Sequence, residues 1–365
     1  MRGMSNLEYN RLVSELQGLV GGRLDRLYDM GGGEFRLRIR LQGKTEDVWL
    51  KLGERLHLTR YIRDAPKEPS NLAMFLRKRI EGARIESLEQ HDFDRVLVFR
   101  FSGEKKHSLV LEMFAEGNLF LLDSDGKIIR CLRREEWKDR TLKEGEHYKF
   151  PQSERLSPPF SKDSLERILE SKAIISILVS KTNFGNDYLE EACKRAGIGL
   201  KENAKNIKEE RLEALASELN AVFKILEPII YLKDGKPTDY SLASLSKYSS
   251  LESRKANSLS EAVDECANSE MDAQAPAPSE HSKKLERLKK RLELQKEHCE
   301  RMLKEAEELK KTGDEIYLRY QEIEGILNSI QEMKKAGKSW VDIKKALEGK
   351  CEIDEHKGKV YFTPR

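Results

Sequence analysis

The sequence has few cysteines and few aromatic residues for its length. Its 365 residues include 5 cysteines, 7% aromatic residues and 38% hydrophobic residues, against 36% charged residues. The cysteines stand alone, without a CxxC pair or a Cys/His cluster, so neither a zinc site nor a disulfide framework is predicted. Scattered cysteines in an odd number are typical of a protein from a reducing cytosol.

Long apolar runs are missing as well. No stretch is long and apolar enough to cross a bilayer. The first thirty residues carry charges throughout and lack the apolar segment of a secretory signal peptide. We therefore expect a cytoplasmic protein without membrane contact.

The motifs of the common enzyme classes do not occur. There is no P-loop, no GxGxxG after a strand, no GxSxG and no HExxH, and the seven histidines are dispersed. A catalytic site assembled from residues far apart in the sequence stays an open alternative. The expectation is a protein without catalytic residues, cofactor or metal of its own.

Charge of one sign is not in excess, since 67 basic and 64 acidic residues give a net charge of +3. This near balance leaves room for local patches of either sign, so the overall charge does not decide whether the chain binds nucleic acid. The length favours two or three domains.

Residues 1–152 are predicted to form an α+β domain with largely antiparallel sheets. Leucines fall on one face of a helix over 5–20, which ends at a glycine pair. Clean alternation over 35–41 predicts a strand with apolar residues inward and arginines outward. Further strands are predicted near 84–90, 94–101, 108–114 and 118–122.

The rest of the chain divides into four parts. Residues 161–250 are mainly helical, and 251–282 are polar and low in complexity, typical of a linker with a short helix inside it. Apolar residues three and four apart predict a long coiled coil over 283–335, in which Gly313 could be a break. A small α/β piece over 336–365 ends the chain. The coiled-coil stripe fits either a homodimer seam or an arm within one chain.

Basic residues gather in two neighbouring stretches of the first domain. They are Arg60, Arg63 and Lys67, followed on a predicted helix by Arg77, Lys78 and Arg79. Guanidinium and ammonium groups placed in this way match phosphate oxygens, and counterion release favours their binding to nucleic acid. A solvated helix face is the alternative.

An acid and an arginine, Asp94 and Arg95, begin the strand that follows this helix. Adjacent strand residues point to opposite faces, so an isolated pair of this kind favours a structural role. Gly185 precedes another predicted helix, whose first N–H groups could bind phosphate. An ordinary helix–turn–helix explains that segment equally well.

Five segments, in order, resemble the NFACT-N domain, once labelled fibronectin-binding protein A N-terminal. They are NLEYNRLVSEL, PSNLAMFLRKRIEGARI, QHDFDRVLVF, LVLEMFAEGNLFLLD and GEHYKFP. The helices after 161 are similar to the helix-two-turn-helix region of the NFACT family, and the later segments to its coiled-coil and middle segments. The chain looks most like archaeal RqcH-type members, related to eukaryotic nuclear export mediator factor. The family's second coiled-coil helix and its NFACT-R domain are not in the sequence, so we expect a longer parent protein.

The resemblance implies ribosome-associated quality control. The family binds large ribosomal subunits blocked by peptidyl-tRNA, recruits aminoacyl-tRNA and directs template-free C-terminal tailing, with alanine expected in prokaryotic members. Asp94 and Arg95 fall on the family's Asp-Arg motif, implicated in tRNA handling. Glu8 corresponds to an acidic residue of the family's first helix, where aspartate is more usual, and the resemblance implies a part in tRNA binding and tailing for it as well.

Two other function classes are weighed against this one. The N-terminal arrangement is also similar to formamidopyrimidine-DNA glycosylases, but that chemistry needs Pro-Glu after the initiator Met, and this chain begins Met1-Arg2-Gly3. The older family label suggests a fibronectin-binding adhesin, against which the lack of a signal peptide argues.

Overall fold

The computed structural model describes residues 2–137, 140–224, 227–274, 280–354 and 359–362. The chain forms two units, Met1–Ala275 and Pro276–Arg365, and each is described by itself. Among the described residues, no helix is long and apolar enough to span a membrane.

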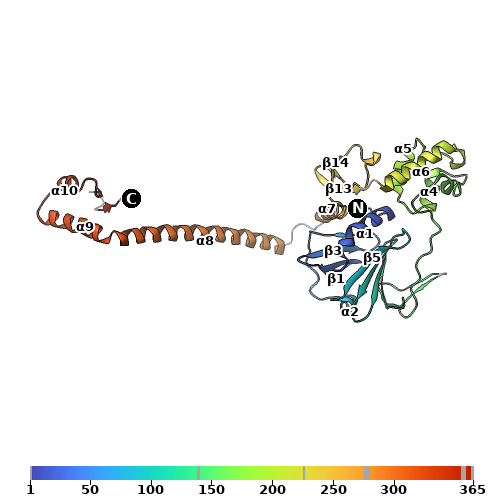
Figure 1. The fold of residues 1–365 in the computed structure, drawn as a ribbon, viewed down its shortest axis with the longest axis horizontal. Helices are drawn as coiled ribbons and strands as arrows, with labels where there is room; N and C mark the ends of the chain where they lie inside the picture. Colours follow the sequence, from blue (N-terminus) through green and yellow to red (C-terminus); the bar gives the residue numbers. More distant parts are fainter. Residues whose placement is uncertain (1, 138–139, 225–226, 275–279, 355–358, 363–365) are drawn as a thin grey trace. The chain divides into compact units, whose positions relative to one another are not determined.

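A nine-stranded antiparallel sheet dominates the first unit (Figure 1). Its order is β4-β3-β2-β1-β5-β6-β7-β8-β9, so two meanders join where β1 meets β5, through the single pair Arg23 and Arg84. The strands are β1 (Arg23–Gly31), β2 (Glu34–Arg40), β3 (Thr45–Lys51), β4 (Arg55–Leu58), β5 (Arg84–Gln90), β6 (Val96–Ser102), β7 (His107–Glu112), β8 (Asn118–Leu122) and β9 (Ile128–Cys131). A hairpin of β10 (Glu135–Glu136) and β11 (Thr141–Leu142) follows.

The alternation predicted over 35–41 is largely confirmed in β2. Phe35, Leu37 and Ile39 lie in the core, as expected for one face of a strand. Arg36, expected to face solvent, is buried instead. Its guanidinium stacks on the ring of Tyr28 and lies 3.6 Å from the carboxylate of Asp47.

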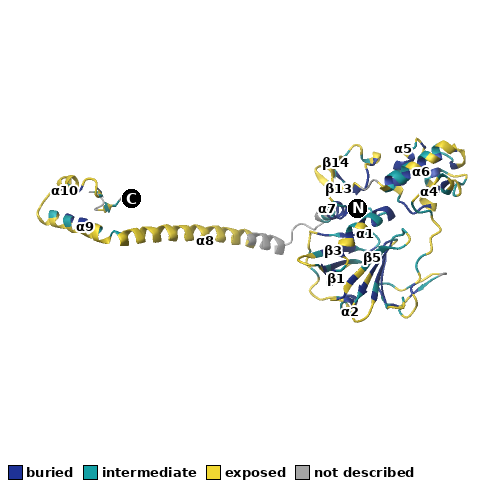
Figure 2. Ribbon diagram, viewed as in Figure 1, coloured by how far each residue is buried: buried dark blue, intermediate teal, exposed yellow. Residues whose placement is uncertain are grey.

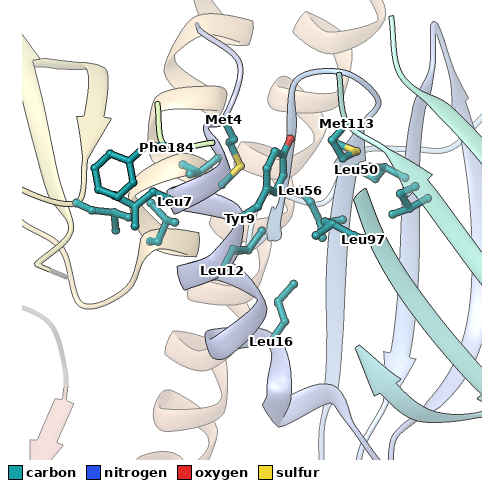
Figure 3. Packing of buried hydrophobic residues seen from close by; sticks show 14 of the residues in the cluster. Met4, Leu7, Tyr9, Leu12, Leu16, Leu50, Leu56, Leu97, Met113 and Phe184 are labelled. Carbon is teal, nitrogen blue, oxygen red and sulfur yellow. The ribbon is translucent and has the colours of Figure 1, made fainter. Parts of the chain in front are cut away.

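Helix α1 (Asn6–Leu16) is the centre of the main core, and a short 3-10 helix, η1 (Gln17–Leu19), follows it. The α1 residues Leu7, Leu12 and Leu16 are fully buried. Figure 3 shows this helix between apolar side chains of the sheet, such as Leu97, and Phe184 of the helical part. One core therefore joins the sheet to the helices. The α+β class predicted from the sequence is confirmed.

The helical part lies after the sheet in the chain, as predicted for 161 onward. It consists of α3 (Lys162–Glu166), α4 (Ile174–Lys181), α5 (Asn186–Arg195), η2 (Ala204–Asn206) and α6 (Glu209–Lys224). A small antiparallel sheet of order β13-β12-β14 follows, made by β12 (Ile229–Lys233), β13 (Lys236–Ser241) and β14 (Glu252–Lys255), with η3 (Ser246–Tyr248) before β14. Helix α2 (Asn71–Ile80) packs against β1.

Much of the predicted linker over 251–282 is folded. Strand β14 pairs with β12, and α7 (Leu259–Gln274) packs against β4, β13 and α1. Leu259, Val263 and Cys266 are buried in the main core. The polar composition misled because the apolar residues of α7 are few and its acidic face is used for contacts with the sheet. The residues 275–279 lie outside the described part of the chain.

The second unit begins with a long helix, α8 (Glu280–Leu318), whose described apolar side chains, among them Leu292 and Leu309, are exposed (Figure 2). The helix ends at Leu318, not at Gly313. Then follow α9 (Tyr320–Lys335), α10 (Trp340–Ala346), β15 (Glu352–Asp354) and β16 (Lys359–Tyr361) around a small core that contains Ile330. The apolar face of α9 thus packs locally, and pairing of α8 in a coiled coil stays a prediction.

A candidate nucleic-acid interface

The Asp94-Arg95 pair lies in the turn between β5 and β6. Asp92 and Phe93 have φ values of 43° and 54°, and the backbone N–H of Asp94 donates to the carbonyl of His91 at 2.7 Å. The carboxylate of Asp94 accepts from the backbone N–H of Arg95 at 2.7 Å and from the Asn6 amide at 3.4 Å. Asp94 therefore fixes the turn, and its carboxylate bonds to main chain and amide N–H groups.

The start of α1 holds the same turn from the other side. The Asn6 amide donates to the carbonyl of Phe93 at 3.0 Å, and the Gln90 amide donates both to the Asn6 carbonyl at 3.0 Å and to the Asp94 carbonyl at 2.9 Å. These bonds give the backbone at Arg95 a defined position before any ligand binds.

Arg95 lines a cleft with two arginines that are distant in sequence, Arg2 and Arg155. The cleft has a volume of about 350 Å³ and is also lined by residues 185–189 at the start of α5. Arg95 is half-buried and Arg155 is exposed. Within the described residues, neither of these two guanidinium groups forms an ion pair. They are therefore available to an anion.

The start of α5 approaches the start of α1 closely at Gly185. This residue has φ 131°, and a Cβ there would lie 2.7 Å from the Cβ of Ser5, so only glycine fits. No side chain caps α5. Its first N–H groups carry partial positive charge, which the carboxylate of Asp187 in the same turn partly offsets.

Glu8 is fully buried and does not line the cleft. Its two oxygens accept from the guanidinium of Arg2 at 2.5 and 2.9 Å, and one of them also accepts from the hydroxyl of Tyr188 at 2.7 Å. Burial opposes ionisation of Glu8, but the ion pair with Arg2 and these hydrogen bonds hold the pKa of the carboxyl below its ordinary value. Glu8 therefore orients Arg2, which does line the cleft.

The same carboxylate belongs to a capping box at the start of α1. The hydroxyl of Ser5 accepts from the backbone N–H of Glu8. The carboxylate of Glu8 accepts in turn from the backbone N–H of Ser5 at 2.7 Å. The spacing Ser-x-x-Glu is the sequence signature of this motif. That spacing could have predicted the local role of Glu8, whereas no motif pointed to Arg2 or Arg155.

The basic residues of α2 are largely engaged with the protein itself. Arg77 donates through Nε to the carbonyl of Leu27 at 2.7 Å, and the guanidinium of Arg79 lies 3.8 Å from the ring centroid of Phe75. Lys78 is exposed. Of the three, Lys78 is thus the residue whose charge lies most openly in solvent.

Helix α2 and Arg95 also lie at opposite ends of β5. The helix ends four residues before β5 begins, and Arg95 follows the turn after β5 ends. Seven strand residues at about 3.3 Å each separate them by roughly 20 Å. The structure therefore does not bring the arginines of α2 into the cleft.

The upstream basic residues contact α7. The backbone N–H of Arg60 donates to Asp264 at 2.8 Å, and its guanidinium lies 3.9 Å from Glu261. Arg63 donates to the side chain of Asn268 at 3.3 Å. Lys67 is exposed. Part of the predicted cationic stretch therefore serves to hold the segment after β4 against α7.

Comparison with known proteins identifies the family. Residues 6–356 match the family described as NFACT N-terminal and middle domains. The chain belongs to the NFACT family. The family resemblance found in the sequence is thereby confirmed.

Curated relatives of this NFACT chain extend beyond it. It is 32% identical to the archaeal Rqc2 homolog aRqcH of Methanocaldococcus jannaschii over 94% of this chain and 54% of that protein. It is 28% identical to the Rqc2 homolog RqcH of Bacillus subtilis over 50% of this chain and 35% of that protein. It is 31% identical to the Drosophila melanogaster ribosome quality control complex subunit NEMF homolog over 49% of this chain and 17% of that protein. The chain spans about half the length of the archaeal relative.

Solved structures share the fold. The fibrinogen binding protein of Staphylococcus aureus matches with a TM-score of 0.61 at 20% identity, covering 71% of this chain and 97% of that chain. The N-terminal part of the fibronectin/fibrinogen-binding protein of Streptococcus suis matches with a TM-score of 0.57 at 23% identity, covering 72% and 98%. At this identity the likeness concerns the fold alone.

Proposed function

We propose that this chain acts in ribosome-associated quality control in the cytoplasm. It binds large ribosomal subunits that carry peptidyl-tRNA, recruits aminoacyl-tRNA and directs template-free addition of alanine to the nascent chain. Support comes from the names of relatives in archaea, bacteria and eukaryotes, which refer to Rqc2 or to ribosome quality control. The subunit's own peptidyl-transferase centre forms the bond, so the chain is a binding factor and not an enzyme.

The three-arginine cleft is the observation that carries the tRNA part of the proposal. Arginine binds phosphate through paired N–H groups, and two of the three guanidinium groups have no protein counterion among the described residues. The uncapped start of α5 adds further N–H donors on the same cleft. An RNA backbone therefore finds both charge and directed donors there.

Each residue of the cleft has a separate part in this proposal. Arg95 and Arg155 contact phosphate directly. Arg2 is held by Glu8 and lies 3.3 Å from Asp187 and 3.5 Å from Asp239. Its charge is therefore compensated within the protein, and it shapes the wall of the cleft. Asp94 does not contact RNA but keeps the backbone of Arg95 in place.

Co-sedimentation with isolated large subunits carrying peptidyl-tRNA tests the proposal. The wild type, Arg95→Ala and Arg155→Ala are compared at two salt concentrations, because charge-driven binding must be measured against salt. We expect the two variants to lose tRNA while keeping the subunit. Arg40→Ala, an exposed arginine on β2 outside the cleft, is the matched control and should behave as the wild type. No association of the wild type with subunits would overturn the proposal for this chain.

A fibronectin-binding adhesin is the second candidate, as the older family label suggests. Binding of the chain to immobilised fibronectin, unaffected by changes in the cleft, would support it. The glycosylase alternative predicts base excision from damaged duplex DNA, and a base-excision assay on the same preparation tests it.

A further inference from the structure

The turn that carries Asp94 and Arg95 holds two residues in the left-handed region of backbone space. Asp92 and Phe93 have φ values of 43° and 54°. Two such residues in a row, closed by the bond from the Asp94 N–H to the His91 carbonyl, form a turn for which Asn-Gly is the preferred sequence. Aspartate tolerates this conformation, but a bulky residue such as phenylalanine is an outlier there. The fold therefore holds Phe93 in a conformation that its own backbone disfavours.

The ring of Phe93 connects this turn to helix α6 of the helical part. It is half-buried and meets the ring of Phe223 edge to face, with the ring centroids 5.9 Å apart and an angle of 69° between the ring planes. Edge-to-face packing at this separation is favourable for two aromatic rings. Glycine would fit the backbone without strain but would lose this contact. The phenylalanine thus fastens the turn of the sheet to α6 despite the backbone strain.

His91, the first residue of the turn, stacks on a second part of the chain. Its ring lies face to face with that of Phe150, with the centroids 3.7 Å apart and the planes 20° apart. Phe150 in turn packs on Tyr148, whose hydroxyl donates to the buried carboxylate of Glu112 at 2.8 Å. The chain runs on from Phe150 to Arg155, which lines the cleft. This stack therefore fastens the turn to the segment that leads to Arg155.

The backbone beside Arg155 is also held from its other side, by the residues at the end of α4. The Leu156 N–H donates to the carbonyl of Lys181 at 2.8 Å, and the Asn183 N–H donates to the carbonyl of Leu156 at 2.8 Å. The backbone of Arg95 is thus tied to the helical part through Phe93, and that of Arg155 through Leu156. The spacing between the two arginines is set by contacts that neither arginine side chain makes.

We propose that Phe93 and His91 are positioning residues of the cleft: their rings hold the backbone of Arg95 at a fixed place relative to Arg155, so that both guanidinium groups meet phosphates of one RNA. This inference rests on the proposed function of the cleft. Among the described residues that line the cleft, neither ring is found, so their effect on binding passes through Arg95. A shift of about 1 Å in a preorganised group weakens binding although no charge is lost.

A purely structural role for the two rings is the competing explanation. In that case the tRNA affinity of a variant would follow its stability. The strained backbone at Phe93 separates the two explanations, because Phe93→Gly and Phe93→Ala lose the same ring. Only glycine adopts a φ of 54° freely, so the two variants differ in strain and in the freedom of the turn, and not in the ring contact.

Thermal unfolding and filter binding of tRNA to the full chain provide the first test. We expect Phe93→Gly to unfold at a higher temperature than Phe93→Ala and yet to bind tRNA no more tightly, with both variants about tenfold weaker than the wild type. Phe75→Ala, at a half-buried ring on α2 outside the cleft, is the matched control and should lose stability at unchanged affinity. Affinity that follows stability, with Phe93→Gly close to the wild type, overturns the positioning role.

A double-mutant cycle shows whether Phe93 acts through Arg95. In the Arg95→Ala background, Phe93→Ala should weaken tRNA binding by less than about twofold, because the side chain whose place it sets is already missing. In the wild-type background, His91→Ala should weaken binding, and His91→Phe, which keeps a ring on Phe150, should restore it. Equal losses for Phe93→Ala in both backgrounds, or a His91→Phe variant no better than His91→Ala, overturn the positioning role and leave the proposed function standing. No tRNA binding by the wild type overturns both.

Discussion

Two arginine-rich regions of the first unit differ in what their guanidinium groups contact. In the cleft, Arg95 and Arg155 have no ion pair within the described residues and face a space of about 350 Å³. On α2, Arg77 bonds to a backbone carbonyl and Arg79 stacks on Phe75. The denser run of basic residues in the sequence is thus the one whose two arginines already contact the protein.

The difference teaches that charge density along the chain does not measure availability to a ligand. The residues of α2 are consecutive because one helix presents them, and a helix that packs on a sheet lays long side chains over its neighbours. The cleft arginines come from the N-terminal segment, the turn before β6 and the segment before α3. Their charges converge only after folding, which is why they leave no run in the sequence.

The largest effect is expected from breaking the pair that holds Arg2 at the cleft. Glu8→Ala removes a fully buried carboxylate that accepts from Arg2, from the Tyr188 hydroxyl and from the backbone of Ser5. Arg2 keeps Asp187 and Asp239 as counterions, so the expected loss of about 3–5 kcal/mol in the free energy of unfolding comes from these lost hydrogen bonds. Urea unfolding followed by circular dichroism measures it. Glu89→Ala, at an exposed ion pair with Arg100, is the control and should change stability by less than about 1 kcal/mol. Equal losses in the two variants would contradict the central role of Glu8.

The contribution of Glu8 depends on pH in a defined direction. Its pKa is lowered in the folded protein, so its stabilising effect is fully present above the pKa of an unfolded glutamate, about 4.3. It is lost as pH falls through the lower, folded pKa. We expect the stability difference between the wild type and Glu8→Gln to be constant above about pH 5 and to shrink at more acidic pH. A difference that grows on acidification would contradict this assignment.

The next largest effect concerns binding and separates the two regions directly. Arg95→Ala removes charge-assisted hydrogen bonds worth about 1.5–3 kcal/mol, so tRNA affinity should fall about ten- to a hundredfold. The fold should be retained, with a change in unfolding free energy within about 1 kcal/mol. Filter binding at fixed salt measures the affinity. An unchanged affinity for Arg95→Ala would remove the cleft from the proposed function.

The sequence predicted more of the fold than of the site. Alternation and turn signals located β5, β6, β7 and β8 almost residue by residue, because burial on one face of a strand imposes a period of two. Asp94 and Arg95 came from the family resemblance, not from any physical signal of their own. Arg2 and Arg155 could not be predicted, since their place in the cleft depends on contacts across the tertiary structure.

The segment over 251–274 shows a second limit of sequence reasoning. The sequence predicted a polar linker with a short helix inside it. The helix exists as α7, but it buries Val263 and Cys266 in the main core and bonds through Ser260 to the edge strand β4 and through Asp264 to Arg60 after that strand. Polar residues that serve as acceptors for an edge strand look the same in sequence as polar residues in solvent.

The smallest effect is expected on the salt dependence of RNA binding. Each phosphate contact contributes roughly 0.7–0.9 to the slope of log affinity against log salt. If α2 binds phosphates as its sequence predicts, neutralising Arg77, Lys78 and Arg79 together should lower the slope by about 2–3. If Lys78 alone is free, as the contacts of its neighbours indicate, the loss should be about 1 or less. The double change Arg95→Ala/Arg155→Ala should lower the slope by nearly 2. A smaller loss of slope there than in the α2 triple variant would show that α2, and not the cleft, binds more of the phosphates.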